Sequence, residues 1–269
     1  MIFLFNRLLF IIILSSTSKI TLSHEFWIDP VNFYIEDNEI LKANIIIGEN
    51  YEGSKIAFSK KDFKNLKLHS KNDSLKIKGR LGDIPAINIK KPFTGLNIIQ
   101  IESEMNYVDY EGLLKFEVFS RKKGYRDLIK IHKDKNYPEN FVESYKRYAK
   151  SLVSVNTFDG SDVDTNMELE FIFLDNPIKN LDEPKKILLE YQNKILTNHQ
   201  VSIMGLKDNY YKRDYTKTNN RGYIEIFFKE DTKYLIESVV IIEGSNKKKN
   251  NYAKWHSLWA SYTLMTPKK

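Results

Sequence analysis

The stretch Glu39-Ile-Leu-Lys-Ala-Asn-Ile-Ile-Ile-Gly48 decides the fold class, because its apolar side chains partly alternate with polar ones. Such alternation is typical of a strand with one buried face. Residues 32–35 form a hairpin-like pair with this strand around the turn Glu36-Asp-Asn38. The chain also contains 16 Tyr and 16 Phe, and aromatic and β-branched residues favour strands. We therefore expect a mainly β protein.

Short segments of the same kind continue on both sides of a turn-rich stretch, residues 159–164. Before it, further strands are expected at 66–69, 75–78, 95–101 and 113–119. After it, strands are expected at 169–174, 187–191, 201–204, 223–228, 238–242 and 258–264. Regularly spaced short strands predict sandwich-type folds. We predict an N-terminal β-sandwich domain over 24–157 and a C-terminal one over 165–269.

One segment between the two predicted sandwiches has helical spacing. Its apolar residues recur at i, i+4, i+7, i+8 and i+11: Phe141, Tyr145, Tyr148, Ala149 and Leu152. This period predicts an amphipathic helix at the end of the first domain, and Pro138 suits its start. Alternation also fits residues 150–155, which leaves open that the helix turns into a strand there.

The three aspartates of Asp159-Gly-Ser-Asp-Val-Asp164 raise the possibility of a Ca²⁺ site. A calcium loop needs a Gly at its sixth position and a closing Glu, and both are missing. We interpret the stretch as an acidic linker between the domains.

Residues 1–23 have the features of a secretory signal peptide. Arg7 precedes the apolar run 8–14, and small polar residues follow. The run is far shorter than the ~20 apolar residues of a membrane span, so we expect no membrane span after cleavage. Thr21 and Ser23 suit cleavage before His24, and a cut after Ser18 is an alternative. The mature protein is expected to be periplasmic or secreted.

The net charge of +7 indicates a lysine-rich surface and no nucleic-acid partner. Nucleic-acid binding needs a clustered basic face, and the densest run, residues 247–249, stands between Asn residues. The chain has no Cys, which excludes disulfides and thiolate metal sites. Motifs of serine hydrolases, P-loop NTPases, zinc proteases and dinucleotide-binding enzymes are also absent. We expect a protein that is not an enzyme.

Cleavage before His24 would create a candidate metal ligand. The freed α-amine and the imidazole Nδ1 of one histidine can close a chelate ring, and such nitrogen ligands suit Ni²⁺, Co²⁺ or Cu²⁺. A free α-amine ordinarily has a pKa of about 8, so losing its proton costs little near neutral pH. A second imidazole would have to come from His69, His132, His199 or His256. Any protein cut before a histidine carries the same atoms, so the alternative is a histidine without a metal.

Three segments in order resemble a family of periplasmic proteins. They are the start His24-Glu-Phe-Trp-Ile-Asp-Pro30, the central Glu143-Ser-Tyr-Lys-Arg-Tyr-Ala-Lys-Ser-Leu-Val153 and the closing Trp255-His-Ser-Leu-Trp-Ala-Ser-Tyr-Thr-Leu264. That family is grouped as a domain of unknown function and described as the periplasmic component of nickel or cobalt transport. The similarity spans essentially the whole mature chain.

The resemblance implies a pair of immunoglobulin-like or transthyretin-like β domains in the periplasm, and a membrane metal transporter as partner. It strengthens the metal hypothesis for His24, with Glu25 as an oxygen ligand and His256 of the closing segment as a further candidate. It also favours a buried ion-pair network of Glu143, Arg147 and Lys150 that supports the fold.

Two other functions stay open. One is an envelope module that holds a partner or a glycan without a metal; exposed Trp27, Trp255 and Trp259 would favour it, whereas we expect all three in the core. The other is a copper enzyme with an N-terminal histidine, which needs a second imidazole near His24.

Overall fold

The structure is a computed structural model that describes residues 24–244 and 253–268. The predicted signal peptide, residues 1–23, and the basic run 247–249 lie outside the described residues. Strands dominate the described chain, so the mainly β prediction is confirmed. No helix in the described ranges is long and apolar enough to cross a membrane.

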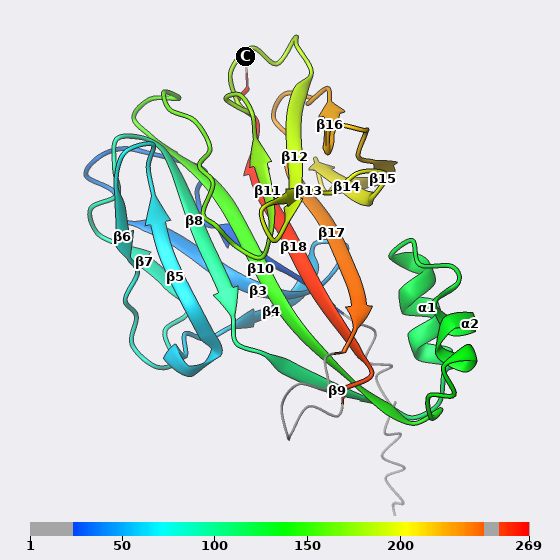
Figure 1. Cartoon of the computed structure of the whole chain (residues 1–269). Coiled ribbons are helices and arrows are strands. Elements are labelled where there is room, and N and C mark those ends of the chain that lie inside the picture. The colour runs from blue at the N-terminus through cyan, green and yellow to red at the C-terminus, as the bar shows by residue number, and fades with distance from the viewer. Residues whose placement is uncertain (1–23, 245–252, 269) are drawn as a thin grey trace, which may run out of the picture.

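A ten-stranded central sheet runs through the whole molecule (Figure 1). Its main order is β15-β14-β17-β18-β10-β8-β5-β6, and β2 and β9 pair with β10. The bounds of its strands are β2 (Tyr34–Ile35), β5 (Phe63–His69), β6 (Ser74–Lys76), β8 (Gly95–Ser103), β9 (Asn106–Tyr110), β10 (Phe141–Val155), β14 (Gln200–Lys207), β15 (Tyr210–Lys217), β17 (Lys233–Glu243) and β18 (Trp255–Met265).

Two smaller sheets complete the architecture. The first outer sheet holds β1 (Glu25–Pro30), β3 (Leu41–Glu49), β4 (Glu52–Ile56) and β7 (Ile87–Ile89). The second outer sheet holds β11 (Leu169–Phe173), β12 (Lys185–Tyr191), β13 (Lys194–Ile195) and β16 (Tyr223–Ile226). A short 3-10 turn, Lys60–Asp62, precedes β5.

The outer sheets cover opposite faces of the central sheet, because successive side chains of a strand point to opposite sides. On β10, Ala149 and Val153 pack with the first outer sheet, whereas Tyr148 and Leu152 pack with the second. The result is three layers with two hydrophobic cores. Each core is a sandwich-like interface, and both share the central sheet.

Strands from both predicted domains lie side by side in this sheet. The strand β10 pairs in parallel with β18, from Glu143 opposite Trp255 to Ser151 opposite Thr263. Figure 1 shows the two strands running together through the middle of the molecule. The predicted boundary at 159–164 falls in the connection from β10 to β11, whose strand belongs to the second outer sheet.

The helix predicted over 141–152 was wrong, since β10 (Phe141–Val155) is one long strand. Both of its faces are buried by sheets, so apolar residues occur on both sides and the period of two is lost. The strand predicted over 113–119 was also wrong. That segment forms α1 (Leu114–Lys122), which is followed by α2 (Leu128–Asp134).

The two helices pack beside one end of the central sheet. Phe116 and Phe119 of α1 contact Trp255 and Trp259 of β18 in a third cluster of buried residues. Trp27 is also in a core, and the three tryptophans are between 1% and 4% exposed. The prediction that all three tryptophans are core residues is therefore confirmed.

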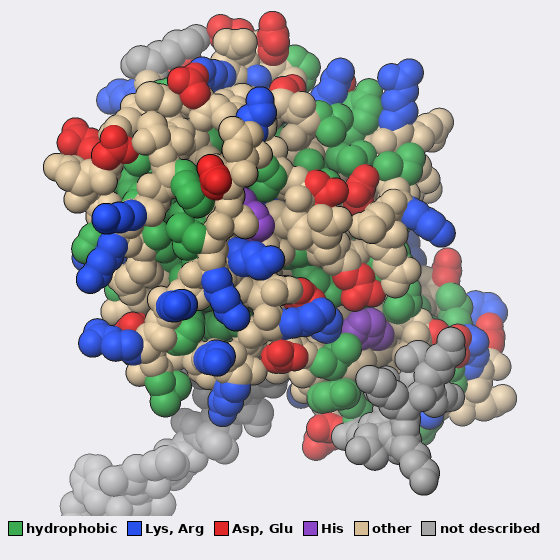
Figure 2. All heavy atoms as spheres, turned by 60° about the vertical axis from the view of Figure 1, so that its left-hand side comes forward, with side chains coloured by type: hydrophobic (Ala, Val, Ile, Leu, Met, Phe, Trp, Pro, Cys, Tyr) green, Lys and Arg blue, Asp and Glu red, His purple; other side chains and the backbone are tan. Residues whose placement is uncertain are grey.

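The surface is rich in charge. Figure 2 shows many Lys and Arg side chains on the lower half of one face, with hydrophobic and acidic side chains between them.

Candidate functional site

His24 stands at the first described position, directly before β1. Pairing of Glu25 with Gly48 on β3 fixes the start of that strand, and therefore the place of the residue before it. The Nδ1 atom of His24 is shielded from solvent and has no hydrogen-bond partner among the described residues. A buried polar atom without a partner is uncommon, and each case calls for a physical explanation.

The surroundings of His24 are set by Arg147 on β10. The Arg147 Nη2 atom donates a hydrogen bond of 3.4 Å to the His24 carbonyl oxygen. Its guanidinium lies between two rings, 5.7 Å from the centre of Phe26 and 4.7 Å from that of Tyr145. Burial lowers the pKa of Arg147, while Tyr145 and Glu143 oppose this change. The histidine therefore sits against a guanidinium that the core holds in place.

Glu25 is poorly suited to a metal-binding role because both of its carboxylate oxygens have partners. Arg213 Nη2 donates to Oε1 at 2.6 Å, and the Asn50 backbone N–H donates to Oε2 at 3.3 Å. Burial and the nearby Glu237 raise the pKa of Glu25, and Arg213 partly opposes them. The carboxylate is thus half of a buried ion pair that joins β1 to β15.

This ion pair belongs to a larger charged cluster that sequence reasoning missed. Lys123 Nζ lies 2.8 Å from Glu237 Oε2, and Arg213 Nη1 lies 3.9 Å from the same oxygen. Lys123 also stands 4.5 Å above the ring of Trp259. The cluster joins the end of α1, the central sheet and β1, and no local spacing in the sequence could have indicated it, because its members are far apart along the chain.

His256 lies on the face of β18 that points away from β1. Leu258 and Ala260, which share its side of the strand, pack with the second outer sheet, whereas the neighbouring Ser261 donates a hydrogen bond to the Phe26 carbonyl on β1. The Nδ1 atom of His256 lies 3.0 Å from the Ser144 hydroxyl. Burial lowers the pKa of His256. The structure does not bring His256 and His24 together.

The other three histidines each have a partner of their own. His69 Nε2 lies 2.7 Å from the Gln100 side-chain oxygen, and His199 Nε2 lies 3.1 Å from the Val239 carbonyl oxygen. His132 accepts a hydrogen bond of 2.9 Å from the Trp255 indole. Within residues 24–244 and 253–268, no three His, Asp or Glu side chains are close enough to hold a metal ion together.

Glu143, Arg147 and Lys150 do not form one network. Glu143 and Arg147 lie on the face of β10 toward β1 and the helices. There Glu143 accepts hydrogen bonds from Tyr110, at 2.8 Å, and from Ser257. Complete burial raises the pKa of Glu143 to about 7. Lys150 lies on the opposite face.

Lys150 is instead the centre of a buried ion triad under the second outer sheet. Its Nζ lies 2.9 Å from Asp162 Oδ1 and 2.9 Å from Glu170 Oε1. It also donates to the carbonyl oxygens of Val163 and Phe171. Asp162 belongs to the predicted acidic linker, and its carboxylate is buried and ties that connection to Lys150 on β10.

Comparison with known protein families places the chain in one of them. A family model described as Domain of unknown function (DUF4198) matches residues 21–241, which is most of the chain, so the protein belongs to that family. No curated protein matches the sequence.

Proposed function

We propose that this member of the DUF4198 family is an exported protein that binds a transition-metal ion through a mature N-terminal histidine, His24. The observation that carries the proposal is the Nδ1 atom of His24, which is buried and lacks a hydrogen-bond partner among the described residues. It lies next to the backbone nitrogen that cleavage before His24 would turn into an amine. An unpaired imidazole nitrogen beside an amine is a ready bidentate ligand.

The proposed site offers two protein nitrogens, the amine and Nδ1. Ni²⁺, Co²⁺ and Cu²⁺ all accept this donor type, and Cu²⁺ binds most tightly by the general order of divalent metals. The remaining coordination positions would be open to water or to ligands from a partner. Such an open site suits capture and release, and a membrane metal transporter is the proposed recipient.

Neither Glu25 nor His256 is part of the proposed site. The Glu25 carboxylate is held by Arg213 and Asn50, and His256 is on the other face of the central sheet. The copper-enzyme alternative needs a second imidazole beside His24, and none of the described contacts supports one. A binding module that works without a metal stays as the second candidate, because no side-chain cluster for a metal lies within the described ranges.

The test begins with the mass of the exported protein, which gives its first residue. Titration with Ni²⁺, Co²⁺ and Cu²⁺ then compares the wild type with His24→Ala and with His256→Ala as the matched control. We expect one ion per chain, loss of binding in His24→Ala, and unchanged binding in His256→Ala. A mature chain that starts elsewhere, or equal binding by the wild type and His24→Ala, would contradict the proposal.

A further inference from the structure

A basic pocket lies on the outer face of the first outer sheet, away from His24. It has a volume of about 760 Å³ and is lined by residues of β3, β7 and the connection from β6 to β7. Pockets that bind small ligands are commonly ~300–1,000 Å³, so the size suits a small molecule or a few units of a polymer.

The paired strands β3 and β7 form the floor of the pocket. Lys42 lies opposite Asn88 in the antiparallel pair, and Lys90, the residue directly after β7, is exposed and lines the same pocket. The intervening Ile87 and Ile89 point into the core. The same alternation that builds the core therefore presents two lysines and an amide to solvent.

The connection before β7 forms the wall, and its shape is fixed by the fold. The Gly82 N–H donates to the Phe58 carbonyl, and the Phe58 N–H donates to the Asp83 carbonyl, at 2.9 and 3.0 Å. Gly79 packs on the Phe58 ring so closely that a Cβ there would come within 2.7 Å of it. The wall is thus built without a ligand, which lowers the cost of ordering it on binding.

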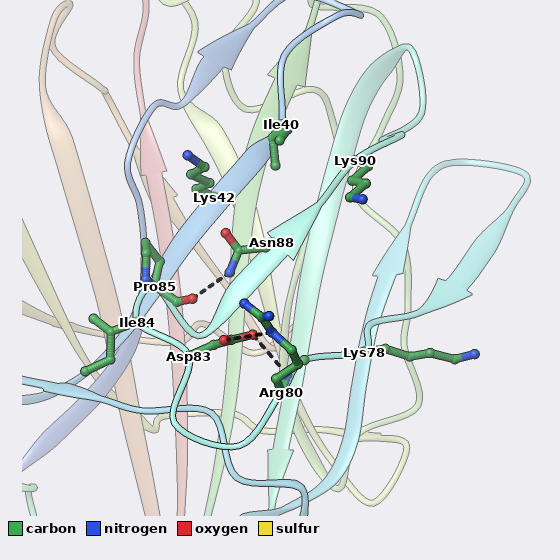
Figure 3. A pocket seen from close by; sticks show the side chains of 10 residues that line it. Ile40, Lys42, Lys78, Arg80, Asp83, Ile84, Pro85, Asn88 and Lys90 are labelled. Atoms are coloured by element: carbon green, nitrogen blue, oxygen red, sulfur yellow. Dashed lines mark hydrogen bonds and ion pairs between the residues drawn. The ribbon is translucent and has the colours of Figure 1, made fainter.

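The charge of the pocket is strongly positive. Figure 3 shows Lys42 and Lys90 on either side of Asn88, with the Arg80 guanidinium facing them and Lys78 extending outward. Asp83 is the acidic residue of the lining and is paired with Arg80 at 3.4 Å. Lysine and arginine side chains around one concavity favour an anionic group, phosphate above all.

The lining also has an apolar part. Ile40, Ile84 and Pro85 stand among the cations, and Ile40 and Ile84 are 44% and 57% exposed. A second pocket of about 320 Å³ shares Ile40 and Lys42 with the first, so the depression continues beyond the charged end. A free ion would use only the charged end, whereas a ring-bearing ligand with an anionic group would use both parts.

We propose that this pocket binds a phosphorylated saccharide, with its phosphate among Lys42, Arg80 and Lys90 and its sugar ring over Ile40 and Pro85. The cations are exposed and their attraction is screened by salt, so binding is expected to weaken at about 0.5 M NaCl. The proposal is independent of the metal site, because the two places share no residue.

The experiment is a calorimetric titration with trehalose 6-phosphate, trehalose, inorganic phosphate and a tetraglutamate peptide. We expect trehalose 6-phosphate to bind at least about 10-fold more tightly than each of the other three. The single variants Lys42→Gln, Arg80→Gln and Lys90→Gln should each weaken it by about 10-fold, as expected for loss of a charge-assisted hydrogen bond.

The matched control is Lys186→Gln with Lys194→Gln, two exposed lysines of the second outer sheet, which should leave binding unchanged. Circular dichroism checks that each variant is folded. The proposal is overturned if trehalose 6-phosphate does not bind, if phosphate or tetraglutamate binds as tightly, or if the control variant loses as much affinity as the pocket variants.

Discussion

At the scale of single residues, the most informative features are charges that the core holds. Lys150 and Glu143 are buried in β10, and Arg213 lies in β15 between Lys212 and Asp214. The residues next to them in the sequence do not reveal their partners. The family resemblance favoured one network of Glu143, Arg147 and Lys150, but a strand sends positions 147 and 150 to opposite faces.

Lys150→Met should destabilise the protein by about 3–5 kcal/mol, because Asp162 and Glu170 would be left as buried carboxylates without their cation. Urea denaturation measures the change in the free energy of unfolding. The control is Lys212→Met, which removes an exposed lysine paired with Asp214 at 2.9 Å and should cost less than about 1 kcal/mol. Equal losses of unfolding free energy in the two variants would show that the buried triad stabilises the protein no more than an exposed ion pair does.

Glu143 should make stability fall as pH rises. Its folded-state pKa of about 7 exceeds the ordinary value of 4.5, so the folded state holds the proton more tightly. Its favourable contribution is complete below about pH 4.5 and is lost as pH rises through 7. The contribution of Glu143 to the free energy of unfolding that is lost over this range is of the order of 3 kcal/mol.

Glu143→Gln keeps a neutral side chain at every pH and should remove this dependence. Urea denaturation of both proteins between about pH 4 and pH 8 should show the variant gaining stability relative to the wild type as pH rises. A constant difference between the two proteins across that range would mean that Glu143 does not titrate there.

At the scale of elements, most strands were predictable, including β8 and β18, which are buried on both faces, whereas the long strand β10 was not. The strand β3 (Leu41–Glu49) kept enough alternation to be recognised at residues 39–48. In β10, by contrast, the apolar residues match a helical spacing. The helix α1 was missed because Leu113 to Phe119 is short, and its apolar residues fit both the period of a strand and the period of a helix.

The assignment of α1 can be tested by its buried face. A strand would put residues 114, 116 and 118 on one side, whereas the helix buries Phe116 and leaves Leu114 and Val118 74% and 47% exposed. Phe116→Ala should cost about 3–5 kcal/mol, and Leu114→Ala should change stability by no more than about 0.5 kcal/mol. Similar losses of stability at both positions, measured by thermal or urea unfolding, would indicate a strand.

At the scale of the whole molecule, the central sheet links the two halves. The mainly β class and the positions of most strands followed from local patterns. The parallel pairing of β10 with β18 did not, because it joins segments more than a hundred residues apart and local periodicity carries no information on such contacts. The same limit applies to the candidate site: His24 could be found from the signal sequence, but the place of His256 depended on sheet register.

The shared sheet predicts that the two halves fold together. A fragment of residues 24–157 would expose the edge of β10 that β18 covers, and a fragment of residues 165–269 would expose the matching edge of β18. We expect neither to unfold cooperatively alone, and we expect far-ultraviolet circular dichroism and tryptophan fluorescence of the whole protein to give one coincident transition. A fragment 24–157 with its own sharp transition would contradict this view.

A freed amine and the imidazole of His24 are proposed to bind one metal ion together. The most direct measurement is the Cu²⁺ dissociation constant of the processed protein beginning at His24, compared with a form whose α-amine is acetylated. Acetylation removes the amine as a donor and leaves the imidazole in place. We expect affinity at least about 100-fold weaker in the acetylated form; equal affinities in the two forms would contradict the proposed chelate.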